Sequence, residues 1–311
     1  MRCLITGGGG FIGSSLCEAL LREGHIVRVF ERPHLKIDKI IHIYKQTEWI
    51  EGDFINSEHI KKAIQGCDIV FHLICTTIPK TSNENPVYDI ESNLISTVNM
   101  LDAARENGIK KIYFLSSGGT IYGIPQKTPI PENHTNDPLC SYGITKLAVE
   151  KYLHLYYKLY GLDYCVLRVS NPYGARQRVS SEQGAVTVFL DQVLNGQEIE
   201  IWGDGTVVRD YIYIEDVIHG IMKALQYDGK QKIFNFGSGK GHSLNDIIRI
   251  IETIWGNPIR YKYKRARPLD VPVNILDISK SNELLHWIPE TTLESGIRQT
   301  LQLMQNWVSK C

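Results

Sequence analysis

Along most of the chain, short apolar runs alternate with longer stretches in which apolar residues recur every three or four positions. The short runs are apolar nearly throughout, which is typical of parallel strands covered by helices on both faces. We predict such strands at Cys3–Thr6, Ile26–Phe30, Asp68–Ile74, Ile112–Ser116 and Cys165–Val169. The helical patterns lie between them, at Ser14–Glu23, Ser57–Gln65, Val87–Glu106 and Tyr142–Tyr160. This alternation predicts an α/β fold with a doubly wound parallel sheet.

The pattern becomes less regular after Asn171, where a loop-rich stretch precedes the next helix. We expect helices near Val186–Leu194, Asp216–Gln226, Leu244–Trp255 and Leu293–Val308, and one more strand at Ile233–Phe236. We interpret residues 1–171 as a cofactor-binding domain that 213–237 rejoin. On this interpretation, 172–212 and 238–311 form a smaller C-terminal α/β domain that binds the substrate.

Composition excludes several classes of function. The 311 residues are 43% hydrophobic, and Lys+Arg and Asp+Glu both number 34. A neutral chain gives no indication of binding to nucleic acid or to a membrane surface. No apolar run approaches the roughly 20 residues that span a bilayer, and the apolar start of the chain is too short for a signal peptide. The seven cysteines include no C-x-x-C pair, so we expect free thiols, a cytoplasmic protein and no metal site.

The segment TGGGGFIG stands directly after the first predicted strand and before the first predicted helix. It places glycine at Gly7, Gly10 and Gly13, with Phe11 and Ile12 between the last two. Glycines let the backbone approach a pyrophosphate, and the N-terminus of the helix offers free N–H groups and the positive end of its dipole. The alternative is an ordinary turn, but such a turn requires neither the strand before it nor the helix after it. We therefore predict that a Rossmann-type domain binds a dinucleotide here.

Glu31 closes the second predicted strand, at the place where a carboxylate bonds the hydroxyls of the adenosine ribose. Because a carboxylate there repels a ribose 2′-phosphate, the sequence favours NAD over NADP, although Arg32 is adjacent. Asp53 and Phe54 follow another short strand. Asp53 could accept a hydrogen bond from the adenine amino group, or it could cap the helix that starts near Ser57.

Tyr142 and Lys146 are four residues apart in a predicted helix and therefore share one face. An ammonium beside a phenol stabilises the phenolate, so we expect the pKa of Tyr142 to be lowered from about 10. Such a phenol could take the proton of a sugar hydroxyl while hydride passes to NAD. The pattern Y-x-x-x-K is common by chance. It becomes specific here because the glycine motif and the turn SSGGT at Ser116–Thr120 precede it.

Further segments continue this pattern over nearly the whole chain: HL at His72–Leu73, Asn93, LRVSNPYG, GDGTVVRDYIYIEDV and RPLDVP. With these motifs the sequence resembles the extended short-chain dehydrogenases/reductases, and among them UDP-galactose 4-epimerase and related nucleotide-sugar epimerases. The resemblance implies tightly held NAD that is returned unchanged. It also implies that Tyr142 removes the proton of the C4 hydroxyl, and that a 4-keto sugar turns before hydride returns.

The resemblance assigns roles to individual residues. It implies that Leu73, Asn93, Ser116 and Ser117 line the cofactor. For a UDP-sugar it implies the following contacts: Asn171, Arg209 and Arg267 on the diphosphate, Asp270 on the ribose and Trp202 near the uracil. It further implies a homodimer that forms a four-helix bundle from two long helices of each subunit, Val87–Glu106 and Tyr142–Tyr160.

The arginines can also be interpreted from the residues alone. Arg209 and Arg267 are isolated within apolar or aromatic sequence, and a guanidinium presents planar donors that match a phosphate. The alternative is that they are buried and paired with Asp210 and Asp270.

One position departs from the epimerases. The hydroxyl that bonds the C4 oxygen usually stands two residues before the threonine of the SSGGT turn, and here that position is Gly118. Ser117 and Thr120 are the nearest replacements, with backbone N–H groups or water as further alternatives. The threonine-rich loop Thr76–Lys80 also differs, so no sugar contact can be assigned to it.

In the epimerases, the residue seven positions after the second phosphate arginine limits the size of the sugar. Here this residue is Asn274, which is smaller than the tyrosine that restricts the site to plain hexoses. We therefore expect UDP-N-acetylhexosamines as substrates beside UDP-glucose and UDP-galactose. The alternative is that Asn274 only satisfies nearby backbone groups.

Other functions within the same group stay open as alternatives. Nucleotide-sugar 4,6-dehydratases need an acid pair in the SSGGT turn and decarboxylases need a glutamate, whereas this chain has Gly119 and Thr120. A reductase is the third enzymatic alternative. A sensor that binds NAD without catalysis is a fourth, against which the retained Tyr142 and Lys146 argue.

Overall fold

The computed structural model describes residues 1–179, 184–265 and 271–308. Its centre is a seven-stranded sheet with the order β10-β6-β5-β4-β1-β2-β3, in which every neighbouring pair is parallel. The strands are β1 (Arg2–Thr6), β2 (Ile26–Glu31), β3 (Glu48–Glu51), β4 (Ile69–His72), β5 (Lys111–Ser117), β6 (Asp163–Val169) and β10 (Ile233–Phe236). The predicted doubly wound parallel sheet is therefore confirmed.

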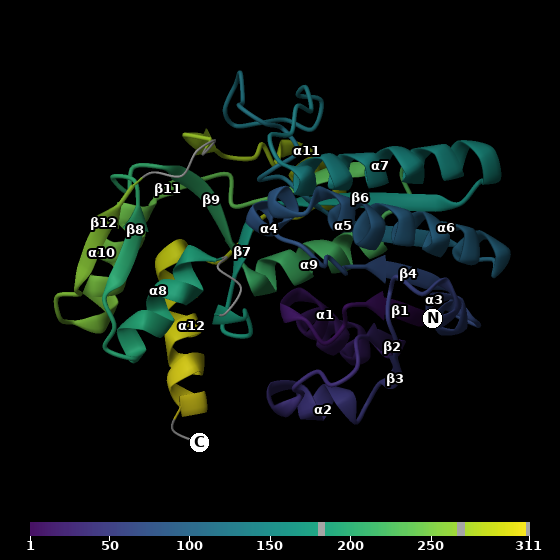
Figure 1. The fold of residues 1–311 in the computed structure, drawn as a ribbon, viewed down its shortest axis with the longest axis horizontal. Helices are drawn as coiled ribbons and strands as arrows, with labels where there is room; N and C mark the ends of the chain where they lie inside the picture. The colour runs from purple at the N-terminus through teal and green to yellow at the C-terminus, as the bar shows by residue number, and fades with distance from the viewer. Residues whose placement is uncertain (180–183, 266–270, 309–311) are drawn as a thin grey trace.

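Helices cover both faces of this sheet (Figure 1). One core contains buried residues of α1 (Phe11–Arg22) and α9 (Ile214–Leu225), and the other contains those of α3 (Ser57–Ile64), α6 (Ser96–Glu106) and α7 (Ser141–Tyr160). The strands other than the edge strand β3 are largely buried on both sides, which explains why they read as apolar runs rather than as alternating patterns. No helix among the described residues is both long and apolar enough to cross a membrane.

The stretch predicted as one helix, Val87–Glu106, is helical but not uniform. It consists of α5 (Pro86–Asp89), a π-helical segment η2 (Ile90–Ile95) and α6. A further helix, α4 (Pro79–Glu84), precedes it and was not predicted. The short elements η1 (Asp38–Ile40) and α2 (Ile41–Tyr44) were not predicted either. All three consist of only one or two turns, which are too few to show a helical period.

The C-terminal part builds two small sheets beside the large one (Figure 1). β7 (Asn171–Tyr173), β9 (Val208–Tyr213), β11 (Gly241–Ser243) and β13 (Val273–Asn274) form the first, and β8 (Ile199–Trp202) and β12 (Tyr261–Lys264) form the second. The helices here are α8 (Ala185–Leu194), α10 (Leu244–Trp255), α11 (Ser279–Leu285) and α12 (Leu293–Val308). β10 pairs with β6, so that segment does return to the large sheet; the proposed domain boundaries stay a prediction.

Candidate active site

The glycine loop joins β1 to α1 and leaves the start of the helix open. Gly7 has a φ of +78°, which favours glycine, and a Cβ on Gly13 would lie 2.2 Å from the Gly7 carbonyl oxygen. Gly10 caps α1 without any side-chain hydrogen bond. The backbone N–H groups of the first turn are thus available to an anion, and this geometry fits a dinucleotide pyrophosphate. Phe11 and Ile12 are partly buried and pack on the core.

Glu31 ends β2 beside the glycine loop. Its Oε2 accepts from the Gly9 N–H at 3.1 Å, and its Oε1 accepts from the Arg32 N–H at 3.1 Å. The carboxylate therefore lies at the carboxyl edge of the sheet next to the glycines, where a ribose would be bound in this type of fold.

Asp53 is exposed and accepts a hydrogen bond from the Ile55 N–H at 3.0 Å. The helix α3 is capped instead by Asn56, whose Oδ1 accepts from the Glu58 N–H at 3.0 Å. The alternative role of Asp53 as this helix cap is therefore wrong, and its contact with adenine stays a prediction. Phe54, next to it, is buried, with its ring 5.2 Å from that of His72.

In the sequence, His72 stands out only as part of the HL motif. In the structure, its ring lies between two hydroxyl groups. Its two ring nitrogens each lie 2.9 Å from a threonine hydroxyl, Thr6 on β1 and Thr97 on α6. Burial lowers the pKa of His72 to about 3, so the ring is neutral near pH 7. Leu73 donates its N–H to the Thr6 hydroxyl at 3.2 Å. This pair therefore ties the end of β4 to the start of the glycine loop.

Tyr142 and Lys146 lie on the first two turns of α7 and share one face, as their spacing predicts. The Lys146 Nζ donates to the Leu115 carbonyl oxygen at 2.8 Å. It lies 5.7 Å from the centre of the Tyr142 ring and 4.7 Å from that of Phe114. The ammonium is thereby fixed between the catalytic helix and the end of β5.

The predicted lowering of the Tyr142 pKa is wrong for the chain by itself. Burial raises the pKa of Tyr142 well above its usual range, and a hydrogen bond with Ser117 acts in the opposite direction. Burial also lowers the pKa of Lys146, against the nearby negative charges of Asp89 and Glu150. The sequence argument counted the charge of the ammonium and missed the cost of removing both groups from water.

The SSGGT turn follows β5 and separates the two candidate hydroxyls. A hydrogen-bond interaction with Ser117 acts to lower the pKa of Tyr142, whereas the buried Thr120 Oγ1 has no hydrogen-bond partner within the described part of the chain. Ser116 is buried and donates to Glu150 at 2.7 Å. Of the predicted replacements for the missing hydroxyl, Ser117 is thus the one that affects the pKa of the phenol.

Gly118 has a clear steric reason to be glycine. A Cβ at this position would lie 2.5 Å from Leu276 Cδ1 and 3.2 Å from the Arg168 carbonyl oxygen. At Gly119 a Cβ would meet only the Ser117 Oγ, at 3.9 Å. Leu276 therefore fills the space beside Gly118, from a segment more than a hundred residues away that no local pattern connects to it.

The structure brings three predicted substrate residues to neighbouring strands. Asn171 on β7 donates to the Asp210 carbonyl oxygen on β9 at 3.0 Å. Arg209 on β9 donates to the carbonyl oxygens of Val208 at 2.9 Å and Val271 at 2.6 Å. Successive strand residues point to opposite faces, so the carboxylate of Asp210 lies on the other side of β9 from the guanidinium. That carboxylate is buried and accepts hydrogen bonds from Ser238.

Asn274 is the third of these residues, because β13 pairs it directly with Arg209. It is 1% exposed and donates its Nδ2 to the Gly118 carbonyl oxygen at 3.2 Å. Its Oδ1 is buried and has no partner among the described residues. The Asn274 side chain does hydrogen-bond a backbone group, as the alternative interpretation required. Its Oδ1 nevertheless remains as an acceptor without a partner among the described residues, beside the SSGGT turn.

The remaining predicted substrate residues are less well tied to the site. Trp202 ends β8, is 40% exposed and lies 5.6 Å from the Lys264 Nζ. It belongs to the second small sheet rather than to the strands that carry Arg209. Arg267 and Asp270 lie outside the described residues.

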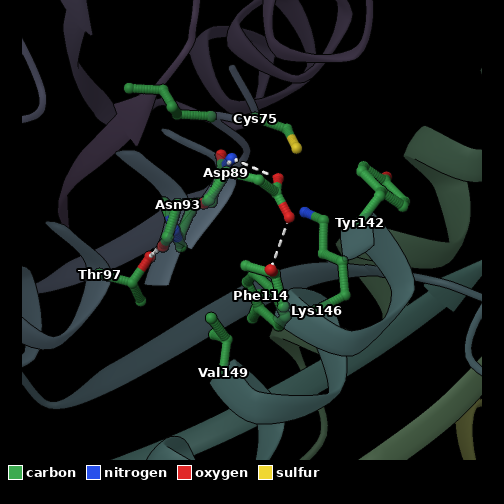
Figure 2. Close-up of a pocket in the computed structure, with 11 residues that line it drawn as sticks. Cys75, Asp89, Asn93, Thr97, Phe114, Tyr142, Lys146 and Val149 are labelled. Atoms are coloured by element: carbon green, nitrogen blue, oxygen red, sulfur yellow. Dashed lines mark hydrogen bonds between the residues drawn. The ribbon is translucent and has the colours of Figure 1, made fainter. Parts of the chain in front are cut away.

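A small cavity lies between α7 and the segment that follows β4, as Figure 2 shows. Its polar lining includes His72, Asp89, Asn93, Thr145 and Lys146, and Tyr142 and Cys75 border it. Asn93, predicted to line the cofactor, is 7% exposed, and its Oδ1 accepts from the Thr76 N–H at 3.0 Å. Sequence reasoning missed Asp89; the only local signal was a carboxylate on an otherwise buried helical face.

Comparison with known proteins gives the family. The model of the NAD dependent epimerase/dehydratase family matches residues 3–237. The chain is 32% identical to UDP-glucose 4-epimerase of Mycolicibacterium smegmatis, over 98% of this chain and 99% of that protein. It is 34% identical to dTDP-4-dehydro-6-deoxyglucose reductase of Escherichia coli, over 96% of each chain.

Solved structures agree with this over the whole length. UDP-glucose 4-epimerase of Thermotoga maritima with UDP-glucose superposes with a TM-score of 0.94 at 34% identity, covering 99% of this chain and 100% of that one. UDP-N-acetylglucosamine 4-epimerase of Methanobrevibacter ruminantium in complex with UDP-N-acetylmuramic acid gives a TM-score of 0.91 at 28% identity, covering 100% and 99%. These similarities confirm the expectations that the protein is an enzyme and that NAD is its cofactor. With the glycine loop and the Tyr142–Lys146 pair both inside the matched segment, the chain belongs to the NAD-dependent epimerase/dehydratase family.

Proposed function

We propose that the chain is an NAD-dependent 4-epimerase of UDP-sugars. The observation that carries this proposal is the placing of Tyr142 and Lys146 on one face of α7, with the Lys146 Nζ donating to the Leu115 carbonyl oxygen at 2.8 Å near the carboxyl end of β5, where Ser117 also lies. This arrangement gathers a phenol, an ammonium and a hydroxyl at one edge of the sheet. The full-length similarity to UDP-glucose 4-epimerases supports the same reaction.

NAD, when bound, would supply the acceptor and the donor for the C4 hydride of the sugar. The residues of the chain move the accompanying proton: Tyr142 takes it from the C4 hydroxyl and later gives it back, which is general base and then general acid catalysis. Because burial raises the Tyr142 pKa, it favours the phenol that forms when Tyr142 takes up the proton of the C4 hydroxyl. Lys146 and Ser117 stabilise the phenolate while the sugar is oxidised, through charge and through a hydrogen bond.

The 4-keto sugar must turn between the two transfers, so it has to be held at a point far from C4. We propose that Arg209 and Asn171 hold the diphosphate, with Arg267 as the second arginine and Asp270 on the ribose. Trp202 would stack near the uracil. On the cofactor side we propose the glycine loop for the pyrophosphate, Glu31 for the ribose, Asp53 and Phe54 near the adenine, and Leu73, Asn93 and Ser116 along the nicotinamide half.

We propose that UDP-N-acetylhexosamines are accepted beside UDP-glucose and UDP-galactose. Asn274 supports this, since its buried Oδ1 has no partner among the described residues and could accept a hydrogen bond from an acetamido N–H. A buried acceptor without a partner costs free energy, which a bound acetamido group would recover.

The test is to incubate the purified protein with separate UDP- and dTDP-sugars, without added cofactor, and to separate the products by chromatography. We expect UDP-glucose to interconvert with UDP-galactose and UDP-N-acetylglucosamine with UDP-N-acetylgalactosamine. Absence of interconversion for every sugar would overturn the proposal. Turnover of plain hexoses alone would overturn only the acetamido part.

A reductase is the second candidate, and the Escherichia coli relative favours it. A reductase consumes NADH or NADPH in proportion to product, whereas an epimerase consumes none. Adding a dTDP-4-keto-6-deoxy sugar with NADH and following absorbance at about 340 nm distinguishes the two.

We also propose a homodimer in which α7 and the helical stretch formed by α5, η2 and α6 pack against the same helices of a second subunit. Apolar side chains are exposed there, and they gather on two neighbouring elements: Val87, Tyr88, Ile90 and Ile95 on one, and Ile144, Tyr152, Leu155, Leu159 and Tyr160 on the other. Exposed apolar patches of this kind are typical of interfaces. Light scattering should give twice the chain mass, and Leu155→Asp should shift it to the monomer; a monomeric wild type would refute the dimer.

A further inference from the structure

Asp89 is a carboxylate buried completely between two helical elements. Its Oδ1 accepts from the Thr77 hydroxyl and from Asn93 Nδ2, the latter at 3.0 Å. Its Oδ2 accepts from the hydroxyls of Ser141 and Thr145, each at 2.7 Å. One oxygen therefore faces the segment that follows β4, and the other faces the first turn of α7.

A buried charge is expensive unless every lone pair is used, and four donors surround this one. The two donors on α7 flank the catalytic side chains. Ser141 directly precedes Tyr142, and Thr145 directly precedes Lys146. Figure 2 shows the Asp89 carboxylate and the Lys146 amine directed into the same cavity.

The start of α7 is held from the same side at the backbone. Cys140, its N-cap residue, provides no side-chain hydrogen bond. The first N–H groups are satisfied by α4 instead: Ser141 N–H donates to Asn83 Oδ1 at 2.9 Å, and Tyr142 N–H donates to Ser82 Oγ at 3.0 Å. The first turn of the catalytic helix thus depends on residues that follow β4 for its orientation.

The threonine-rich loop belongs to this arrangement. Thr76 N–H donates to Asn93 Oδ1 at 3.0 Å, and its hydroxyl lies 2.6 Å from that of Ser92. Asn93 and Ser92 lie in the π-helical segment η2, a distortion often found at functional sites. The loop that had no assignable sugar contact therefore has a structural partner, and Asp89 is the point where it meets α7.

We propose that Asp89 is a positioning residue for Tyr142 and Lys146, which it holds by fixing the hydroxyls of Ser141 and Thr145 to the segment 76–93. Its effect on rate rests on the proposed epimerase function, because it sets where the phenol meets the sugar. A displacement of about 1 Å at a reacting group can cost about 10²-fold in rate.

The test removes one donor at each end of the carboxylate. Thr145→Val and Thr77→Val delete a hydroxyl and keep the β-branched shape, while Thr145→Ser and Thr77→Ser keep the hydroxyl. With the faster of UDP-glucose and UDP-N-acetylglucosamine as substrate, we expect each valine variant to lose about 10- to 100-fold in kcat. KM and bound NAD should stay near wild type, and each serine variant should recover kcat to within about 3-fold of wild type.

A second measurement needs no substrate. Hydrogen–deuterium exchange of the amides from Ser141 to Lys146 should be faster in both valine variants of the NAD-loaded protein and near wild type in both serine variants. Unchanged exchange, unchanged kcat in Thr145→Val, or equal losses for valine and serine would each overturn the proposal. If the wild type turned over no UDP-sugar, the epimerase function would fall, and the exchange data would still decide whether Asp89 holds the turn.

Discussion

Replacing Gly118 by serine tests whether Leu276 takes the place of a hydroxyl. The new Cβ would lie 2.5 Å from Leu276 Cδ1, where carbon atoms in contact need about 3.5–4.0 Å. Leu276 cannot retreat easily, because it is fully buried and its N–H donates to Asp210 Oδ2 at 3.2 Å. The second close atom, the Arg168 carbonyl oxygen, belongs to the central sheet.

Overpacking of this kind costs about 1–3 kcal/mol, and the short distance places Gly118→Ser at the upper end. For 311 residues the entropy of unfolding is about 0.65 kcal/mol/K, so this corresponds to a fall in Tm of roughly 4–5 °C. Differential scanning calorimetry at one fixed NAD concentration measures it, because a bound cofactor itself raises Tm. Gly119→Ser is the matched control: its Cβ would have space, so we expect a change below about 1 kcal/mol.

A double-mutant cycle isolates the contact. Leu276→Ala alone should cost about 2–5 kcal/mol through the cavity it leaves. Combined with Gly118→Ser, the loss should be smaller than the sum of the two by about 1–3 kcal/mol, since the serine then occupies part of that cavity. A Gly118→Ser variant as stable as wild type, or strictly additive losses, would refute the steric explanation.

The other predictions concern the phenol, its hydroxyl partner and the buried histidine. Tyr142→Phe should keep NAD bound and lose about 10²–10⁴-fold in epimerisation, measured by product chromatography; turnover within a few-fold of wild type would contradict its role. Ser117→Ala should lose about 10²-fold in kcat, whereas Thr120→Ala should lose less than about 10-fold; the reverse order would assign the hydroxyl to Thr120. The pKa of His72 is lowered to about 3 in the folded chain, below the unfolded value near 6.5, so the unfolded chain binds the extra proton. Stability should therefore fall as pH drops from about 6.5 towards 3, by up to about 1.4 kcal/mol per unit, and denaturant titration of His72→Asn should show a shallower slope; equal slopes would mean that another group dominates.

Much of the large sheet could be predicted from the sequence, because each of its strands except the edge strand β3 is a largely buried apolar run. The Tyr142–Lys146 pair could be found because helical spacing alone brings these residues to one face. Two strands of the first small sheet could not be found: β11 and β13 have only three and two residues, too few for any period. The fit of Leu276 against Gly118, and of Asp89 between Thr77 and Thr145, depends on distant segments meeting, which no local pattern encodes.

The predicted lowering of the Tyr142 pKa was wrong for a different reason. Spacing shows which charge is near, but the balance between charge and burial depends on how much water the folded chain excludes. The spacing identifies Lys146 as the partner of the phenol, but only the packing of β5 and α7 around the two groups shows that desolvation is the larger effect.

The late arrival of β10 has a consequence for how the chain is made. β6 ends at Val169, and the strand that covers its outer edge begins at Ile233. During synthesis at about 5–20 residues per second, that edge waits for about 70 further residues, or roughly 4–14 s. Throughout this interval an apolar strand offers unpaired N–H and C=O groups to any neighbouring nascent chain. A fragment cut at Asn171 would keep that edge permanently, so we expect it to aggregate where the full chain stays dispersed.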